Sequence, residues 1–387
     1  PYAAGSTSRR SGSPDWVLLH RSARFSDLQN STTVKSKTRD GQAVEVSFWL
    51  VHPPGVSYFS VHCPGLNEDD FVSEPCVICA EAALVLFCVT LNIPGNLTST
   101  HHFVYRAGPG EPALHLLPDP NPNVAVSAAA ALKFGLLPFH DEHYAVVFLN
   151  RHLTKYGTWH FVVDLFSSKT QAWNSKVALL SLSESENKFF CRHDTCKQIT
   201  IGSSLGWVDL LRGILVVHKV FDEYPVIKYI PFPESRPFSP DKEESDAPQY
   251  FRDVACCNNM IKFVHIESHD PCCTGNKDWK ATTWNRKLSW GDWRQRFTVK
   301  VDDISVDQSY SALLPELWDS ETGKLDLKKL NFYTPTLSMC DDDFLYVMSK
   351  VNDEDDKAWV ITVDMKHEVV QAVAPFSAGD MDFLPMY

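Results

Sequence analysis

The sequence has little positive charge and no long hydrophobic run, and both shortages exclude functions. It holds 36 Lys and Arg against 48 Asp and Glu, which gives a net charge of −12. Phosphate backbones and anionic lipid surfaces repel such an acidic chain, so we expect neither nucleic acid nor membrane as a partner. The longest apolar stretch, at 82–89, is far shorter than the roughly 18 residues of a membrane-spanning helix.

Sequence motifs of common enzymes are also missing. There is no Gly-x-Ser-x-Gly elbow, no Gly-x-Gly-x-x-Gly turn and no phosphate-binding loop. Ser203 and Ser204 lie beside glycines, but they lack the strand–elbow–helix context of a catalytic serine. We therefore predict no catalytic residue and no cofactor.

The cysteines predict a reducing compartment. Their count is eleven, which is odd, and their spacing is irregular, so the chain is not a disulfide framework. We expect a cytoplasmic or nuclear location. Organellar import stays open, because the chain starts at Pro1 and its first fourteen residues are rich in Ser, Gly and Arg, as in a disordered lead. Sequons at Asn30 and Asn96 would fit a secreted protein instead.

Four clusters resemble parts of metal sites. Cys76 and Cys79 form half of a zinc motif, and His101 and His102 are adjacent. The loop at 191–196 and the cluster at 140–143 mix Cys or His with acids. A tetrahedral zinc site needs four ligands, and none of these clusters supplies the rest nearby. We predict no bound metal. The alternative is a metal held on the central axis of a β-propeller, the fold that the repeat described below predicts.

The residues that are abundant favour strands. Hydrophobic residues make up 44% of the chain, and short runs of Val, Phe, Trp and Tyr alternate with Pro, Gly, Asn and Asp. This pattern predicts many short strands, too many for one sandwich, while segments 124–133 and 311–319 are possible short helices. We predict an all-β fold.

An internal repeat indicates how the strands are grouped. Trp159 and Asp164, followed by Gln171, recur two hundred residues later as Trp359, Asp364 and Gln371. The repeated unit is a meander in which the Trp packs on one sheet face and the Asp opens a turn. Such repeats predict a β-propeller, and we count six blades. Seven blades, or two packed sandwiches, are the alternatives. After the lead at 1–14, a single domain at 15–387 would hold long loop inserts and candidate blades at 16–66, 72–118, 132–180, 197–234, 248–302 and 332–376.

Several stretches resemble a known family. They include PDWVLLH at 14–20, VSFWLVHPPGVS at 46–57, LGWVDLLRGILVV at 205–217, YIPFP at 229–233 and FRDV at 251–254. They are similar to a plant family, expanded in grasses, that is catalogued as domain of unknown function 1618. That family is in turn similar to the propeller-like domains associated with plant F-box proteins, although this chain carries no recognisable F-box. The resemblance implies no catalytic residues, because no activity is established for the family.

Charged and aromatic residues within these stretches are the candidate site. Charges at apolar strand ends need partners, so they either pin blade to blade or line a central pocket. Exposed Trp beside Arg is typical of protein interfaces. The predicted binding residues are Trp207, Asp209, Arg212, Arg252, Asp253, Trp284 and Trp293.

We therefore expect a non-enzymatic, intracellular plant module that recognises another protein through one face of the propeller. Two alternatives remain open: a propeller hydrolase with an axial metal, and a receptor that binds a small molecule in an apolar central pocket.

Overall fold

The structure consists almost entirely of short strands. The computed structural model describes residues 14, 16–93, 95, 97–108, 110–120, 132–139, 143–153, 159–180, 193–233, 247–268, 278–340, 342–352 and 355–377. Helical turns in these ranges are 3-10 turns of three to five residues: Glu68–Asp70, Pro248–Tyr250, Val301–Asp303, Gln308–Ala312, Pro315–Leu317 and Leu327–Lys329. No helix of the described chain has the length and hydrophobicity needed to span a bilayer.

Six sheets of four or five strands form the blades. Blade 1 contains β1 Leu18–Leu19, β2 Arg24–Phe25, β3 Val34–Lys37, β4 Ala43–Trp49 and β5 Val56–His62. Blade 2 contains β6 Cys76–Glu81, β7 Leu84–Ile93, β8 Leu97–Arg106 and β9 Ala113–Leu116. Blade 3 contains β10 Phe134–Phe139, β11 His143–Leu153, β12 Trp159–Ser167 and β13 Ala172–Leu180.

The second half of the chain repeats this plan. Blade 4 contains β14 Lys197–Ile201, β15 Ser204–Asp209, β16 Gly213–His218 and β17 Val226–Pro231. Blade 5 contains β18 Arg252–Cys257, β19 Met260–Ser268, β20 Trp279–Arg286 and β21 Arg294–Lys300. Blade 6 contains β24 Asn331–Leu337, β25 Phe344–Lys350, β26 Lys357–Asp364 and β27 Val369–Ser377. A small hairpin, β22 Trp318–Asp319 with β23 Lys324–Leu325, lies in the insert before blade 6.

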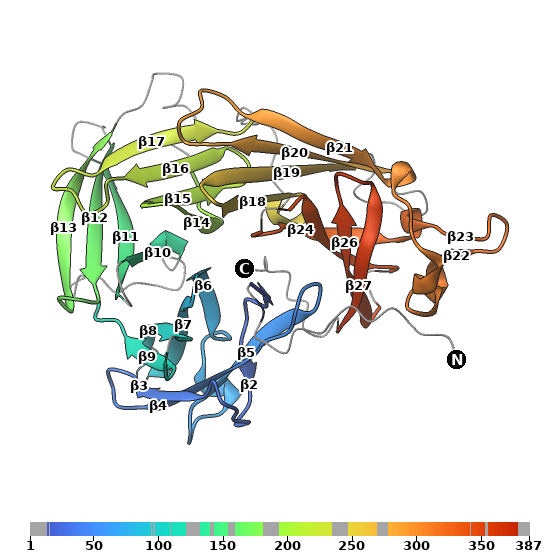
Figure 1. The fold of residues 1–387 in the computed structure, drawn as a ribbon. Helices are drawn as coiled ribbons and strands as arrows, with labels where there is room; N and C mark the ends of the chain where they lie inside the picture. The colour runs from blue at the N-terminus through green and yellow to red at the C-terminus, as the bar shows by residue number, and fades with distance from the viewer. Residues whose placement is uncertain are drawn as a thin grey trace.

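The blades are arranged in a ring, as Figure 1 shows. Blades 2 to 6 are antiparallel meanders, and their first strands, β6, β10, β14, β18 and β24, contact one another in this order. In blade 1 the order is β1-β5-β4-β3, and β1 pairs with β5 in parallel. The fold is an all-β, six-bladed propeller, as the sequence predicts.

Burial explains why the sheets form a ring. Each sheet is apolar on both faces, and a separate apolar cluster fills each interface from blades 1 and 2 round to blades 5 and 6. A further cluster packs Leu18 of blade 1 against Tyr346 and Met348 of blade 6, and the ring of Trp16 lies 5.3 Å from that of Tyr346. A twisted sheet that is apolar on both sides is stable only when both sides are covered, and the ring covers all of them.

The outer strands of blades 3 and 4 also pair with each other. Leu179 and Leu180 of β13 lie opposite Val226 and Ile227 of β17, in parallel. This pairing joins the two blades into one eight-stranded sheet. It also covers part of two strand edges that would otherwise present free backbone groups.

The internal repeat occupies equivalent strands but in different registers. Asp164 lies in β12 and Asp364 in β26, each the third strand of its blade. Asp364 ends its strand and accepts hydrogen bonds from the backbone of Lys366 and His367, so it opens a turn as predicted. Asp164 instead lies inside its strand, where Asn150 and Ser175 donate to it. The prediction of a turn is therefore wrong at Asp164, because β12 continues to Ser167.

The predicted helices have different outcomes. Segment 311–319 contains 3-10 turns and then strand β22, since Pro315 interrupts the backbone hydrogen bonding that an α-helix would need. Most of segment 124–133 lies outside the described residues.

Candidate functional site

The predicted residues of blade 4 are buried at its central hairpin. The side chain of Trp207 is 1% exposed, and its Nε1 donates to the carbonyl of Lys133 in the neighbouring blade. Arg212 donates to Asp209 over 3.0 Å across the β15–β16 turn. Asp209 also accepts from the backbone of Asp194 and Leu211, and burial raises the pKa of its carboxyl against these favourable contacts.

The predicted residues of β18 connect blade 5 to its neighbours. The guanidinium of Arg252 donates to the carbonyls of Leu210 and Leu211 in blade 4. Asp253 accepts from the Lys197 ammonium of blade 4 over 2.8 Å and from the backbone N–H of Leu337 in blade 6 over 2.9 Å. One carboxylate therefore links three blades near the axis, which is the pinning arrangement that embedded charges predict.

The two predicted tryptophans belong to the interface between blades 4 and 5. Trp284 is buried in the apolar cluster there, and Trp293 packs against it and donates from Nε1 to the carbonyl of Pro231 over 2.8 Å. Of their neighbours, Trp290 lies under the Arg294 guanidinium, 4.0 Å from it. Packing within the ring accounts for Trp284, and the binding role of the seven residues remains a prediction.

The axis of the propeller holds a small pocket, whose lining is mostly apolar but includes charged side chains. Its lining comes from β6, β14, β18 and β24 and includes Glu81, Lys197, Asp253 and Cys256, with Trp16 from the N-terminal segment. The cavity volume is about 60 Å³. Burial raises the pKa of Glu81 above its ordinary value. A pocket of this size has room for water, but it is far below the roughly 300–1,000 Å³ of small-molecule sites.

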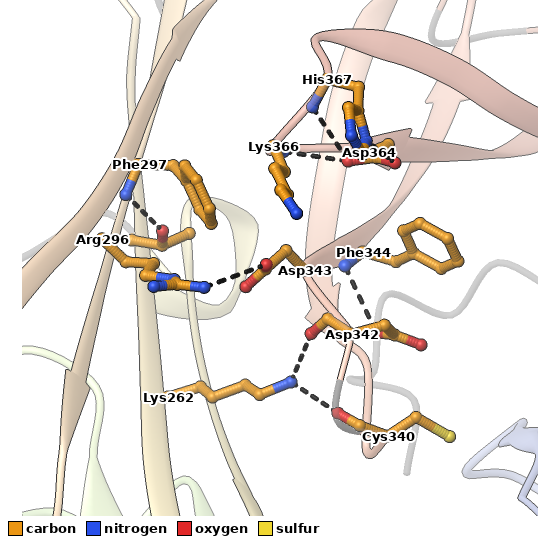
Figure 2. A network of polar contacts seen from close by, with 11 residues as sticks. Lys262, Arg296, Phe297, Cys340, Asp342, Asp343, Phe344, Asp364, Lys366 and His367 are labelled. Atoms are coloured by element: carbon orange, nitrogen blue, oxygen red, sulfur yellow. Dashed lines mark hydrogen bonds and ion pairs between the residues drawn. The ribbon is translucent and has the colours of Figure 1, made fainter.

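A second polar network joins blades 5 and 6, as Figure 2 shows. The ammonium of Lys262, on β19, donates to the carbonyls of Cys340 and Asp342 over 2.6 and 2.7 Å. It also donates to the carbonyl of Ser338 over 3.3 Å. Arg296 of blade 5 reaches Asp343 over 3.4 Å. The three protons of a buried ammonium match three carbonyls, so this network fixes the segment that enters β25.

The metal-like motifs do not assemble into a site in the described part of the chain. There, no group of three or more His, Cys, Asp or Glu side chains has an arrangement that could hold a metal ion. His140, Asp141, Glu142 and Cys191 lie outside the described residues. His102, which is 2% exposed, packs against Phe134, and burial lowers its pKa to about 3.

A larger pocket opens on the outer side of blade 4. It has a volume of about 500 Å³ and lies between the β14–β15 turn and the β16–β17 hairpin. Its lining combines hydroxyl, imidazole, ammonium and apolar groups from Ser203, Ser204, His218, Lys219, Val220, Phe221, Asp222, Val226 and Lys228.

A hydroxyl–imidazole pair forms the polar floor of this pocket. Ser204 and His218 are separated by fourteen residues, and Ser204 Oγ and His218 Nδ1 share a hydrogen bond of 3.0 Å. Burial and the Lys228 charge lower the pKa of His218. Sequence reasoning considered Ser204 only as a nucleophile and missed this pair, although hairpin counting places residues 204 and 218 side by side on β15 and β16.

Exposed apolar side chains lie on the β16–β17 hairpin, whose Phe221 lines the pocket, and on the adjoining strand β13, and we call them the apolar rim. Phe221 and Tyr224 project from the β16–β17 hairpin with 46% and 56% exposure, and Val177 and Leu179 of β13 are 56% and 53% exposed. The backbone holds the two elements together, because Leu179 N–H donates to the carbonyl of Pro225. Lys176 also donates to the carbonyls of Val220 and Phe221.

Comparison with known proteins identifies a family for the central part of the chain. A family model described as "Protein of unknown function (DUF1618)" matches residues 207–346. This match confirms the resemblance seen in the sequence. The matched region runs from the end of β15 through the rest of blade 4 and blade 5 to the start of blade 6. No curated protein matches the chain.

Two solved structures illustrate the level of structural similarity. The β-propeller domain of the Trilobed protease from Pyrococcus furiosus matches at 11% identity, with 79% of this chain and 84% of that chain covered and a TM-score of 0.29. The catalytic domain of the Coprinopsis cinerea GH62 α-L-arabinofuranosidase matches at 12% identity, with 84% and 91% covered and a TM-score of 0.28. At such scores the propeller assignment rests on the strand pairing, and no activity transfers to this chain.

Proposed function

We propose that the chain is a non-enzymatic protein-interaction module of an intracellular plant protein, and that it binds its partner at the outer side of blades 3 and 4. The observation that carries this proposal is the apolar rim, which lies beside a pocket of about 500 Å³. As the likeness to F-box-associated domains implies, the partner would be held for recognition or assembly.

The rim has the chemistry of a binding surface. Large apolar side chains that are half exposed cost free energy in water, and contiguous groups of them commonly mark interaction sites. Aromatic side chains such as Tyr224 are enriched among residues that dominate binding energy. The pocket supplies the polar part, since Ser204 and His218 form hydrogen bonds and Lys219 and Lys228 carry positive charge.

The plant origin and the intracellular location that we propose rest on other observations. The resemblance described in the sequence analysis supports a plant origin, because the family that the chain resembles there is a plant family. Eight described cysteines have free thiols, which supports a reducing compartment.

The alternative functions find less support. A receptor with an apolar central pocket is disfavoured by size, because the axial pocket measures only about 60 Å³. A hydrolase with an axial metal needs several ligands converging on one point. The axial pocket offers Glu81 and Asp253, and Asp253 already binds Lys197.

Affinity capture with paired variants tests the proposal. The double variant Phe221→Asp and Tyr224→Asp places two charges in the rim, and the matched control Leu97→Asp places a charge at a side chain of blade 2 that is 62% exposed. From plant tissue, wild type and control should capture the same protein, and the double variant should lose it. The captured protein, once purified, should then bind wild type with at least roughly tenfold higher affinity than the double variant.

Circular dichroism and thermal unfolding of all three proteins establish that the folds are equal. A partner that binds the double variant and wild type equally well would refute the assignment of this surface.

A further inference from the structure

Two cysteines of blade 2 face each other across adjacent strands. Cys76 of β6 lies directly opposite Cys88 of β7 in the antiparallel register. Their Sγ atoms are 3.5 Å apart. Both are free thiols, Cys76 partly exposed and Cys88 buried at 3% exposure.

This geometry fits a disulfide with little backbone movement. Directly opposed residues of an antiparallel pair have Cα atoms about 4.5–5.5 Å apart. Disulfides form at Cα separations of about 4.4–6.8 Å, with sulfur atoms about 2.05 Å apart. The sulfur atoms therefore need to approach by about 1.5 Å, which side-chain rotation can supply.

The surroundings make the two thiols chemically different. The hydrogen bond with Cys88 and the nearby Arg21 charge lower the pKa of Cys76 to about 7, against the opposing effect of burial. The same contact and burial raise the pKa of Cys88 well above its ordinary value. Cys76 is therefore the sulfur that ionises first and reacts first, and Cys88 stays protonated beside it.

We propose that Cys76 and Cys88 form a reversible oxidation site, at which a peroxide converts the two thiols into a disulfide. The Cys76 thiolate attacks one oxygen of the peroxide, the O–O bond breaks, and Cys76 becomes a sulfenic acid while hydroxide, or alkoxide from an alkyl peroxide, leaves. Cys88 sulfur then attacks Cys76 sulfur. The S–O bond breaks, the Cys88 proton goes to the leaving oxygen, and water departs. A thiol reductant restores both cysteines.

The site lies where the N-terminal segment meets blade 2. Ser22 forms a β-bridge with Cys76, and Val77 N–H donates to the carbonyl of Arg21 over 2.8 Å. The same segment carries Leu18 into the apolar cluster with blade 6. A disulfide at this position ties the strand that holds the N-terminal segment to the strand behind it. The inference does not depend on the proposed partner surface.

Peptide mapping of the full chain under non-reducing conditions tests the proposal. Cleavage after glutamate separates the two cysteines. Glu74 and Glu111 stay uncut because each precedes a proline, so Glu68, Glu81 and Glu142 delimit fragment 69–81 with Cys76 and fragment 82–142 with Cys88. After treatment with hydrogen peroxide and alkylation, wild type should yield these fragments joined by a disulfide, and dithiothreitol should separate them.

Three variants assign the bond, because fragment 69–81 also contains Cys79. Cys76→Ser and Cys88→Ser should both abolish the linked fragments, and Cys88→Ser should leave a Cys76 sulfenic acid that dimedone traps. The control Cys79→Ala removes the buried thiol of the same strand and should keep the link. In wild type, Cys76 should lose its thiol roughly tenfold or more faster than Cys79 at pH 7, since burial raises the pKa of Cys79.

Circular dichroism identifies any variant that fails to fold, and Cys88→Ala then replaces Cys88→Ser. Absence of the linked fragments in wild type would overturn the proposal, as would their persistence in Cys76→Ser or their loss in Cys79→Ala.

Discussion

Replacing Lys262 by methionine tests whether the buried ammonium holds blade 6 against blade 5. The side chain of Lys262 is 8% exposed, and its three hydrogen bonds end on carbonyls of the segment that enters β25. Figure 2 shows the bonds to Cys340 and Asp342. Met keeps an unbranched stem but donates no hydrogen bond. The three carbonyls of Ser338, Cys340 and Asp342 then lose their protein donor.

The expected cost follows from the number and type of bonds lost. A hydrogen bond to a charged group contributes about 1.5–3 kcal/mol, and carbonyls that reach water recover part of this. Two of the three bonds are short, so we expect Lys262→Met to lower the free energy of unfolding by about 2–4 kcal/mol. For a chain of 387 residues this corresponds to a fall in Tm of about 3–5 °C.

Urea denaturation measures the difference, and a matched variant calibrates it. Lys280 lies on the neighbouring strand β20 and pairs with Glu267 over 2.9 Å, with both side chains more than a third exposed. A surface pair of this kind contributes about 0–1 kcal/mol, so Lys280→Met should change stability little. Equal stability of the two variants would show that the reasoning about Lys262 is wrong.

Three further predictions concern buried groups of the ring. Arg212→Ala leaves the Asp209 carboxylate buried without its ion pair. Urea denaturation should show the free energy of unfolding lowered by about 3–5 kcal/mol, a larger effect than the one on partner binding. A variant that stays stable but no longer binds the partner would assign Arg212 to the binding site. Gly213→Ala would place a Cβ against the Ile230 carbonyl and the Tyr229 hydroxyl and should lower Tm markedly. In the control Gly291→Ala the new Cβ meets no atom within 4 Å, so Tm should stay unchanged. Equal Tm values of the two variants would contradict the packing at Gly213. Burial lowers the pKa of His102 to about 3 in the folded chain, so its contribution to stability is complete above pH 6.5 and is lost as the pH falls towards 3. Between pH 6.5 and 5, the free energy of unfolding of wild type should fall by about 2 kcal/mol more than that of His102→Leu. Parallel pH profiles of the two proteins in unfolding titrations would refute this.

The sequence predicts the fold well because the propeller repeats local patterns. Each blade is a meander of neighbouring strands, so the apolar runs and the turn residues between them fall in chain order. The prediction of a helix at 311–319 is wrong for a reason that is also local, because Pro315 lies in the middle of the segment. The register of the repeat was not predictable, because Asp164 and Asp364 hold the same place in the repeat but have different partners across the sheet.

The candidate site is predictable only in part. Embedded charges such as Asp253 predict a buried partner, and the structure supplies Lys197 from another blade. No sequence pattern identifies that partner, because 56 residues separate the two. The sequence does not identify the three carbonyls that bind Lys262 either. Every residue has a backbone carbonyl, and only the fold brings these three to the ammonium.

The closing interface between blades 6 and 1 has a consequence for how such rings change in size. In the described residues, β1 pairs with β5 of its own blade, and the contact with blade 6 is made by side chains such as Leu18, Tyr346 and Met348. No main-chain ladder among the described strands joins the last blade to the first. A duplicated blade inserted at this junction would therefore break no strand pairing of its neighbours. It would need only two apolar faces of suitable shape, so a change in blade number at this junction leaves the strand pairing of both neighbouring blades intact, unlike one between blades 3 and 4, which share a sheet.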